Sequence, residues 1–171
     1  MEIIDNFLPN NNFYHIKNII TSQYFPWCYA PTLKNVETGE INELEHKETQ
    51  NQFVHLFYNF DVPVTEYFQE LKCFREKLEV KSLVRIKANL NPCVDKVLEH
   101  GYHIDLPDCT TAVYYLNTCE GYTKFETGEV VESVENRIVI FDSNIKHTGT
   151  TTTNPTGRFV IGGPHGDTGL T

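Results

Sequence analysis

The 171-residue sequence has no C-x-x-C pair, no long apolar run and few basic side chains for its length. Its five cysteines are odd in number and match neither a disulfide framework nor a zinc knuckle, so we expect free thiols in a reducing compartment. A helix that crosses a bilayer needs about 18 successive apolar residues, and the sequence has no such run. Because Glu2 and Asp5 stand where a secretory leader would carry Lys or Arg, we predict a cytoplasmic protein.

Positive charge is scarce. Lys and Arg total 14 against 23 Asp and Glu, which gives a formal net charge of -9 at pH 7. This balance repels a phosphate backbone, so we do not expect a nucleic-acid partner. The length and the 40% hydrophobic content suit one compact domain that spans residues 1–171.

Two amphipathic helices are expected before the main run of strands. Phe13, Ile16 and Ile20 recur at helical spacing, which predicts a helix that begins near Asn10. A second apolar stripe with helical spacing follows Pro63. We expect both helices to pack against one sheet.

Residues 31–52, between the two helices, are polar and show no sustained period. A loop of this length is either a binding lid or a solvated acidic loop, and the sequence leaves both open. The following segment, 52–58, has the pattern of a strand and contains His55. A lone histidine in an apolar run is more often a core residue than a metal ligand, and we interpret His55 in that way.

Apolar and polar residues alternate from Ser82 to Leu90, which predicts a strand with one apolar and one polar face. The sequence does not decide which face points inward. If the apolar face packs on the helices, the polar face lines the mouth of a cavity and Asn89 lies near the site. The alternative is a polar row that faces solvent.

Further strands are expected at 109–116, 137–141 and 158–161, and Gly162-Gly163-Pro164 should end the last of them. Many short strands after two helices predict a mostly β fold with flanking helices, a double-stranded β-helix or jelly roll. The expected division is helical support with a lid loop over 1–81, the jelly-roll core over 82–161, and a mobile tail over 162–171.

His103 and Asp105 are two residues apart, so on an extended segment their side chains project to the same side and can bind one ion. His147, in a later strand-like segment, can supply a third ligand. Two imidazoles and one carboxylate that leave other positions open are the ligand set of non-haem Fe(II) oxygenases. Arg158, the one Lys or Arg after His147, suits the carboxylate of a co-substrate. The alternative reading of His103 and Asp105 is an ordinary surface turn.

With these residues the chain resembles the Fe(II)/2-oxoglutarate-dependent dioxygenases of the prolyl 4-hydroxylase-like branch, in particular the small single-domain members found in marine phages and bacteria. The resemblance covers nearly the whole sequence. It is carried by His103-x-Asp105, Thr111-Ala-Val-Tyr-Tyr115-Leu-Asn117, Gly121-Tyr-Thr-Lys-Phe125, Arg137-Ile-Val-Ile-Phe141, His147, Arg158 and three N-terminal elements, Glu2-Ile-Ile-Asp-Asn-Phe-Leu8, Phe25-Pro26-Trp27 and Arg85-Ile-Lys-Ala-Asn-Leu90.

The resemblance implies that His103, Asp105 and His147 bind iron and that Arg158 binds the distal carboxylate of 2-oxoglutarate. It also implies that the hydroxyl of Tyr115 contacts the same carboxylate, although Tyr115 could instead be a core aromatic.

Thr111 shares a strand face with Tyr115 and is a candidate for the pocket wall, and Asn89 is a candidate for contact with the cofactor. His165 could be proposed as a stray metal ligand, but the triad is complete without it.

The implied cofactors are Fe(II), 2-oxoglutarate as co-substrate and O₂. The implied activity couples decarboxylation of 2-oxoglutarate to succinate and CO₂ with hydroxylation of an unidentified substrate, either a small molecule or a peptide side chain. A non-catalytic jelly-roll module that senses a metal or an organic acid is the alternative. An iron halogenase is disfavoured because Asp105 occupies the position that halogenases resembling this site leave to a small residue. The oligomeric state is not readable from the sequence.

Overall fold

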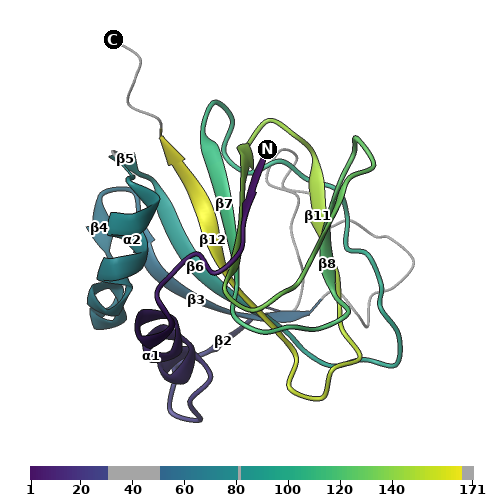
Figure 1. Ribbon diagram of the computed structural model, residues 1–171, viewed down its shortest axis with the longest axis horizontal. Helices are drawn as coiled ribbons and strands as arrows, with labels where there is room; N and C mark the ends of the chain where they lie inside the picture. Colours follow the sequence, from purple (N-terminus) through teal and green to yellow (C-terminus); the bar gives the residue numbers. More distant parts are fainter. Residues whose placement is uncertain (31–50, 81, 167–171) are drawn as a thin grey trace.

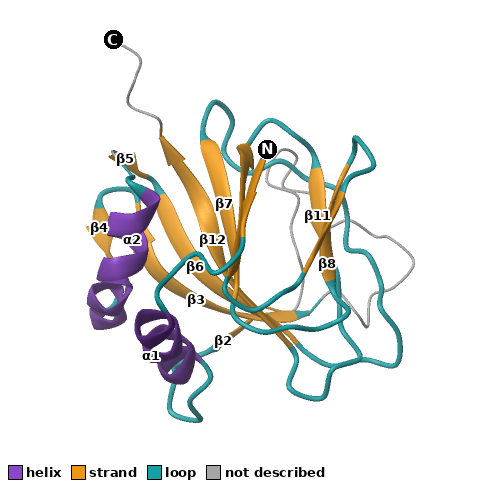
Figure 2. Cartoon of the chain, in the orientation of Figure 1, coloured by secondary structure: helices purple, strands orange, loops and turns teal. Residues whose placement is uncertain are grey.

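The computed structural model describes residues 1–30, 51–80 and 82–166. Two helices, one 3₁₀ helix and two antiparallel sheets make up these residues (Figure 1, Figure 2). The expected lid loop and the last residues of the expected tail lie outside the described residues. The elements are β1 (Glu2–Ile4), α1 (Asn10–Ile20), β2 (Cys28–Ala30), β3 (Gln52–Asn59), β4 (Val62–Pro63), η1 (Glu66–Leu71), α2 (Lys72–Leu78), β5 (Ser82–Leu83), β6 (Arg85–Asn91), β7 (Thr110–Tyr115), β8 (Tyr122–Phe125), β9 (Val130–Glu132), β10 (Arg137–Asp142), β11 (His147–Gly149) and β12 (Arg158–Gly166).

The large sheet has nine strands, and its main path runs β1-β10-β7-β12-β6-β3-β2. The small sheet has the order β11-β8-β9. Segment 98–103 extends the small sheet beside β11, because the backbone N–H of Thr151 donates to Leu98 and that of His100 donates to Gly149. Figure 1 shows the small sheet facing one side of the large sheet and both helices lying on the other. This arrangement confirms the predicted jelly roll with its helices on one sheet.

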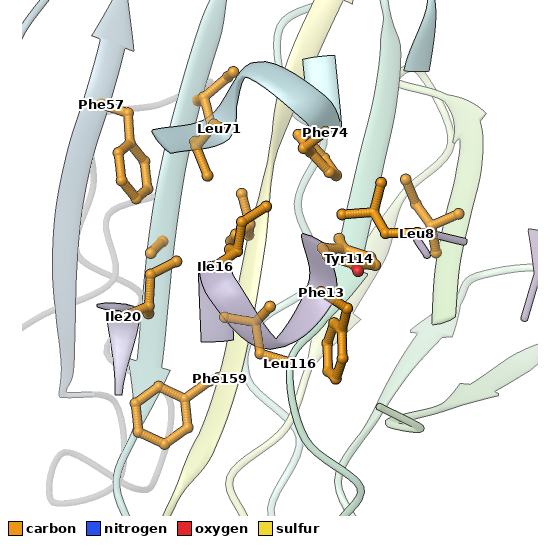
Figure 3. Packing of buried hydrophobic residues seen from close by; sticks show 14 of the residues in the cluster. Leu8, Phe13, Ile16, Ile20, Phe57, Leu71, Phe74, Tyr114, Leu116 and Phe159 are labelled. Carbon is orange, nitrogen blue, oxygen red and sulfur yellow. The ribbon is translucent and has the colours of Figure 1, made fainter. Parts of the chain in front are cut away.

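The helices and the outer face of the large sheet enclose the larger apolar core (Figure 3). Phe13, Ile16 and Ile20 of α1 are buried in it, as predicted. Tyr114 of β7 packs edge-on against Phe13. The second helical segment begins at Glu66, not at Pro63, because Pro63 pairs with β3 in β4. It consists of a 3₁₀ turn followed by α2.

Alternation along β6 and β7 separates the two faces of the large sheet. Ile86 and Ala88 belong to the core under the helices, which settles the question that the sequence left open. The polar residues of β6 therefore face the space between the two sheets. On β7 the same rule places Ala112 in the helical core and Tyr115 in a smaller apolar cluster between the sheets.

The structure contradicts the prediction of where the last strand ends. Gly162-Gly163-Pro164 does not end it: β12 continues to Gly166, with β7 on one side and with β6 and then β5 on the other. A Cβ at Gly162 would lie 2.5 Å from the backbone oxygen of Ala112, and one at Gly163 would lie 2.3 Å from that of Arg85. The glycines therefore allow close backbone approach inside a central strand, whereas the sequence suggested a break.

His55 is a core residue, as interpreted from the sequence. Its Nδ1 lies 2.9 Å from the carbonyl oxygen of Pro26, and its Nε2 lies 3.0 Å from the hydroxyl of Thr65. The five cysteines carry free thiols. None of the helices among the described residues has the length and apolar character required to span a membrane.

Candidate metal centre and anion site

Backbone pairing joins the two histidines of the predicted triad. The N–H of His103 donates to the carbonyl of His147 at 3.0 Å, and the N–H of His147 donates to the carbonyl of His103 at 2.9 Å. Two residues that exchange both hydrogen bonds lie directly opposite each other, so their side chains leave the sheet on the same side. The two imidazole centroids are 4.6 Å apart. Asp105, two residues after His103, completes a group whose ligand atoms all lie within 4.8 Å of one another.

The orientation of both imidazoles is fixed through Nδ1. His103 Nδ1 lies 3.2 Å from the carbonyl oxygen of Gly101, and His147 Nδ1 lies 3.1 Å from that of Ile145. A carbonyl oxygen only accepts, so each Nδ1 carries the proton and each Nε2 keeps a free lone pair. Metal-binding histidines are commonly held by this kind of second hydrogen bond.

Both oxygens of the Asp105 carboxylate have partners. The hydroxyl of Thr111 on β7 donates to Oδ2 at 3.0 Å, and Nη2 of Arg85 on β6 lies 3.4 Å from Oδ1. Oδ2 is also 3.8 Å from Nε2 of His147. The carboxylate is therefore held in one position beside both imidazoles, and Thr111 contributes to the triad itself.

The protonation states suit a divalent cation. Burial lowers the pKa of His103 and of His147, so both imidazoles are neutral at pH 7. Burial alone would raise the pKa of the Asp105 carboxyl, but electrostatic interactions with its surroundings, including the cationic side chains Lys87 and Arg85, bring the pKa below its ordinary value. Two neutral imidazoles and one carboxylate are therefore ready to bind a metal without losing a proton.

A tight turn places Arg158 at the start of β12. Gly157 has φ +84°, and a Cβ there would lie 2.6 Å from Leu90 Cδ1, so a glycine is required. The amide of Asn117 spans this turn: its Nδ2 donates to the Gly157 carbonyl at 2.8 Å, and its Oδ1 accepts the N–H of Phe159 at 2.9 Å. The turn therefore holds the Arg158 side chain over the inner face of the sheet.

The guanidinium of Arg158 is buried, and no described carboxylate pairs with it. The side chain is 2% exposed. Its Nη2 donates to the hydroxyl of Thr123 on β8 at 3.1 Å, and its Nε has no hydrogen-bond partner among the described residues. Tyr115 also donates to Thr123 Oγ1, at 2.8 Å, and the Arg158 guanidinium lies 5.4 Å from the centre of the Tyr115 ring. Because Thr123 accepts both bonds, its own hydroxyl hydrogen remains available to a ligand.

Several buried polar atoms without hydrogen-bond partners lie near Arg158 and on the inner face of β6. Six buried side-chain nitrogen or oxygen atoms among the described residues lack a hydrogen-bond partner, and five of them belong to the inner strand β6, to His100 or to Arg158. Asn91 lies directly opposite Arg158 in register, and its Oδ1 is unpartnered. Burial and the charge of Arg158 lower the pKa of His100 to about 4, so it is neutral. Buried polar groups normally have partners, and such a concentration of exceptions indicates a site for a polar ligand.

The structure brings together most of the residues predicted as a site. His103, Asp105 and His147 form one group, and Thr111 contacts Asp105 directly. Tyr115 reaches Arg158 through Thr123, and Asn89 lies on the inner face of β6 with an unpartnered Oδ1.

His165 lies apart from the triad, beside α2, where it lines a small cavity with Phe74.

The sequence predicts that the polar face of β6 lines the mouth of a cavity if the apolar face packs on the helices, but of that face it singles out only Asn89 as a site residue. It does not single out Arg85, Lys87, Asn91, His100 or Thr123. The alternation of β6 was the available signal for the first three, because it placed them on one face with Asn89. Thr123 lies within the Gly121–Phe125 motif, but its partners come from strands distant in sequence.

Fold and site together define a class: a double-stranded β-helix with two histidines and one aspartate around a common point and a buried cation beside it. Among solved structures, the chain is similar to a Trichoplax adhaerens prolyl hydroxylase in complex with a hypoxia inducible factor peptide, with 18% identity, TM-score 0.67, and coverage of 97% of this chain and 83% of that one. It is also similar to a Pseudomonas putida prolyl-4-hydroxylase, with 15% identity, TM-score 0.56, and coverage of 96% and 90%. A 2OG-Fe(II) oxygenase family protein from Burkholderia pseudomallei has 11% identity, TM-score 0.61, and coverage of 96% and 84%. These likenesses confirm the predicted resemblance at the level of the fold.

No family model matches the sequence. Among curated proteins, S-adenosylmethionine synthase of Fusobacterium nucleatum subsp. nucleatum is 54% identical over 43 residues, which are 25% of this chain and 10% of that protein. The enzyme of the same name from Azobacteroides pseudotrichonymphae genomovar. CFP2 is 60% identical over 37 residues, 22% of this chain and 8% of that protein. The chain therefore spans about a tenth of the length of these curated relatives.

Proposed function

We propose that the protein is a non-haem Fe(II) dioxygenase that couples decarboxylation of 2-oxoglutarate to hydroxylation of a substrate. The observation that carries the proposal is the presence of two features between the two sheets: a His-Asp-His group within 4.8 Å, and a buried guanidinium with no described carboxylate partner. A metal would bind to the His-Asp-His group, and a dicarboxylate co-substrate would pair with the guanidinium of Arg158. The solved structures of similar fold support this proposal, because they are those of two prolyl hydroxylases and a 2OG-Fe(II) oxygenase family protein.

The donor set fits iron. Nε2 of His103, Nε2 of His147 and one oxygen of Asp105 would bind Fe(II) on one side and leave other positions for co-substrate and O₂. When bound, the iron supplies the redox chemistry that activates O₂. The protein keeps both imidazoles neutral and correctly turned, through the bonds from Nδ1, and it keeps Asp105 ionised through Thr111 and its positive neighbours.

Arg158 would bind the distal carboxylate of 2-oxoglutarate. Its fork of N–H groups matches the two oxygens of a carboxylate, and its Nε has no other partner among the described residues. Thr123 would add a hydroxyl hydrogen bond, while Tyr115 holds Thr123 in place and closes the apolar side of the pocket. Asn89 and Asn91 would line the wall of the same pocket. We propose that residues 1–171 form one domain with this activity.

Spectroscopy and product analysis test the proposal. Anaerobic titration with Fe(II) and 2-oxoglutarate should give a metal-to-ligand charge-transfer band, and His103→Ala should remove it. His15→Ala is the matched control, because His15 is an exposed histidine paired with Glu70 and should leave the band intact. In air, succinate should form from 2-oxoglutarate. The absence of a band in the wild type would refute the proposal, and a band without succinate would favour a binding module.

A further inference from the structure

The inner face of β6 carries two positive side chains beside the triad. Arg85 and Lys87 are two residues apart on this strand, and both project to the side opposite the helical core. Arg85 Nη2 lies 3.4 Å from Asp105 Oδ1, which fixes this end of the strand at the triad. The charge of Lys87 acts on all three triad residues, shifting the pKa of each.

Lys87 has no counterion of its own. Its register neighbours are Leu56 on β3 and Gly162 on β12, and neither can offer a negative group. No hydrogen bond or ion pair joins its ammonium group to another described residue. Arg85 is only partly engaged, since its buried Nε has no hydrogen-bond partner among the described residues.

In the proposed function, the charges of the metal, Arg158, Asp105 and the co-substrate cancel without any contribution from Arg85 and Lys87. Bound Fe(II) and Arg158 carry three positive charges, and Asp105 with the 2-oxoglutarate dianion carries three negative charges. Arg85 then adds a further positive charge. Burial and the neighbouring charge of Arg85 lower the pKa of the Lys87 ammonium group, and an anion beside it would favour its charged form. Unpaired charge away from water is costly, so an anion is expected beside them.

We propose that Lys87, supported by Arg85, is a subsite for a carboxylate on the substrate, so that the oxidised molecule is an organic acid or carries a free carboxylate close to the reacting C–H bond. The inference rests on the proposed function and narrows its substrate class. A neutral segment in the middle of a peptide would leave Lys87 unpaired. A free acid, a chain-terminal carboxylate or an acidic side chain would pair with it.

Binding of matched acids and amides tests the subsite. The protein is loaded with Zn(II), which is redox-inactive, and saturated with 2-oxoglutarate so that Arg158 is occupied. Isothermal titration calorimetry then compares propionate with propionamide, and N-acetyl-L-proline with N-acetyl-L-prolinamide. In at least one pair the carboxylate should bind about 30-fold more tightly than the amide. Lys87→Met should abolish the preference and Lys87→Arg should retain most of it.

Two controls keep the outcomes separate. Lys72→Met makes the same change at an exposed lysine of α2 and should leave the preference unchanged. Lys87→Met should still bind 2-oxoglutarate within about twofold of the wild type, which shows that the variant is folded and that the co-substrate site is intact. Equal binding of acid and amide in both pairs, or a preference that survives Lys87→Met, overturns the subsite. Failure of the wild type to bind 2-oxoglutarate at all refutes the proposed function instead.

Discussion

Replacement of Arg158 by Met should strengthen the fold and weaken co-substrate binding at once. Arg158 is 2% exposed, its guanidinium pairs with no described carboxylate, and it donates a hydrogen bond to Thr123. Exchange of a buried ion pair for apolar side chains of similar volume is often neutral or stabilises by about 1–4 kcal/mol, and the same desolvation cost applies to a buried charge without a described carboxylate partner. Loss of the hydrogen bond costs about 1 kcal/mol. The free energy of unfolding should therefore rise by about 0–3 kcal/mol.

Affinity for 2-oxoglutarate should change in the opposite direction. Removal of one partner from a buried charge pair costs about 2–5 kcal/mol, which is a rise in Kd of about 30-fold to 4,000-fold. The wild type should gain about 2.7 kcal/mol of stability when 2-oxoglutarate is present at about 100 times Kd, and the variant should gain about 0–0.9 kcal/mol at that concentration.

Urea unfolding of the metal-free protein and titration of the metal-loaded protein measure the two effects. Arg137→Met is the matched control: Arg137 pairs with Asp5 at 2.6 Å and 3.1 Å near the surface, so its loss should lower stability modestly and leave the 2-oxoglutarate Kd unchanged. A loss of several kcal/mol in metal-free Arg158→Met, with the Kd preserved, would refute the reasoning and make Arg158 a structural residue.

Three further changes probe the site and its frame. Thr111→Val removes the hydroxyl that holds Asp105, so metal affinity measured by competition with a chelator should fall about 10-fold to 100-fold; an unchanged affinity would contradict this. Gly162→Ala places a Cβ 2.5 Å from the carbonyl oxygen of Ala112 and should lower the free energy of unfolding by about 1–3 kcal/mol, and full stability would show that the strand can shift. Burial opposes ionisation of Glu120, but hydrogen bonds lower its pKa to about 2, so its contribution is complete above pH 4.5 and is lost as the pH falls toward 2. The stability difference between wild type and Glu120→Gln should follow that window in acid unfolding, and a difference that does not vary with pH would argue against the carboxylate's role.

The sequence by itself determined the local features of this protein. The spacing of Phe13, Ile16 and Ile20 predicted a helix and its buried face, and alternation on β6 predicted one apolar and one polar face. The two-residue spacing of His103 and Asp105 placed both side chains on one side. These properties depend only on the periodicity of helix and strand, which a linear sequence displays directly.

Tertiary structure decided which of these residues are neighbours. His147 meets His103 because two segments pair residue for residue, and a shift of one residue would turn one imidazole to the opposite face. Thr123 joins Tyr115 to Arg158, although the three come from three different strands. The inward orientation of Lys87 and the continuation of β12 through two glycines also follow from packing against other strands. Strand register and close backbone approach are relations between distant segments, so the sequence does not display them.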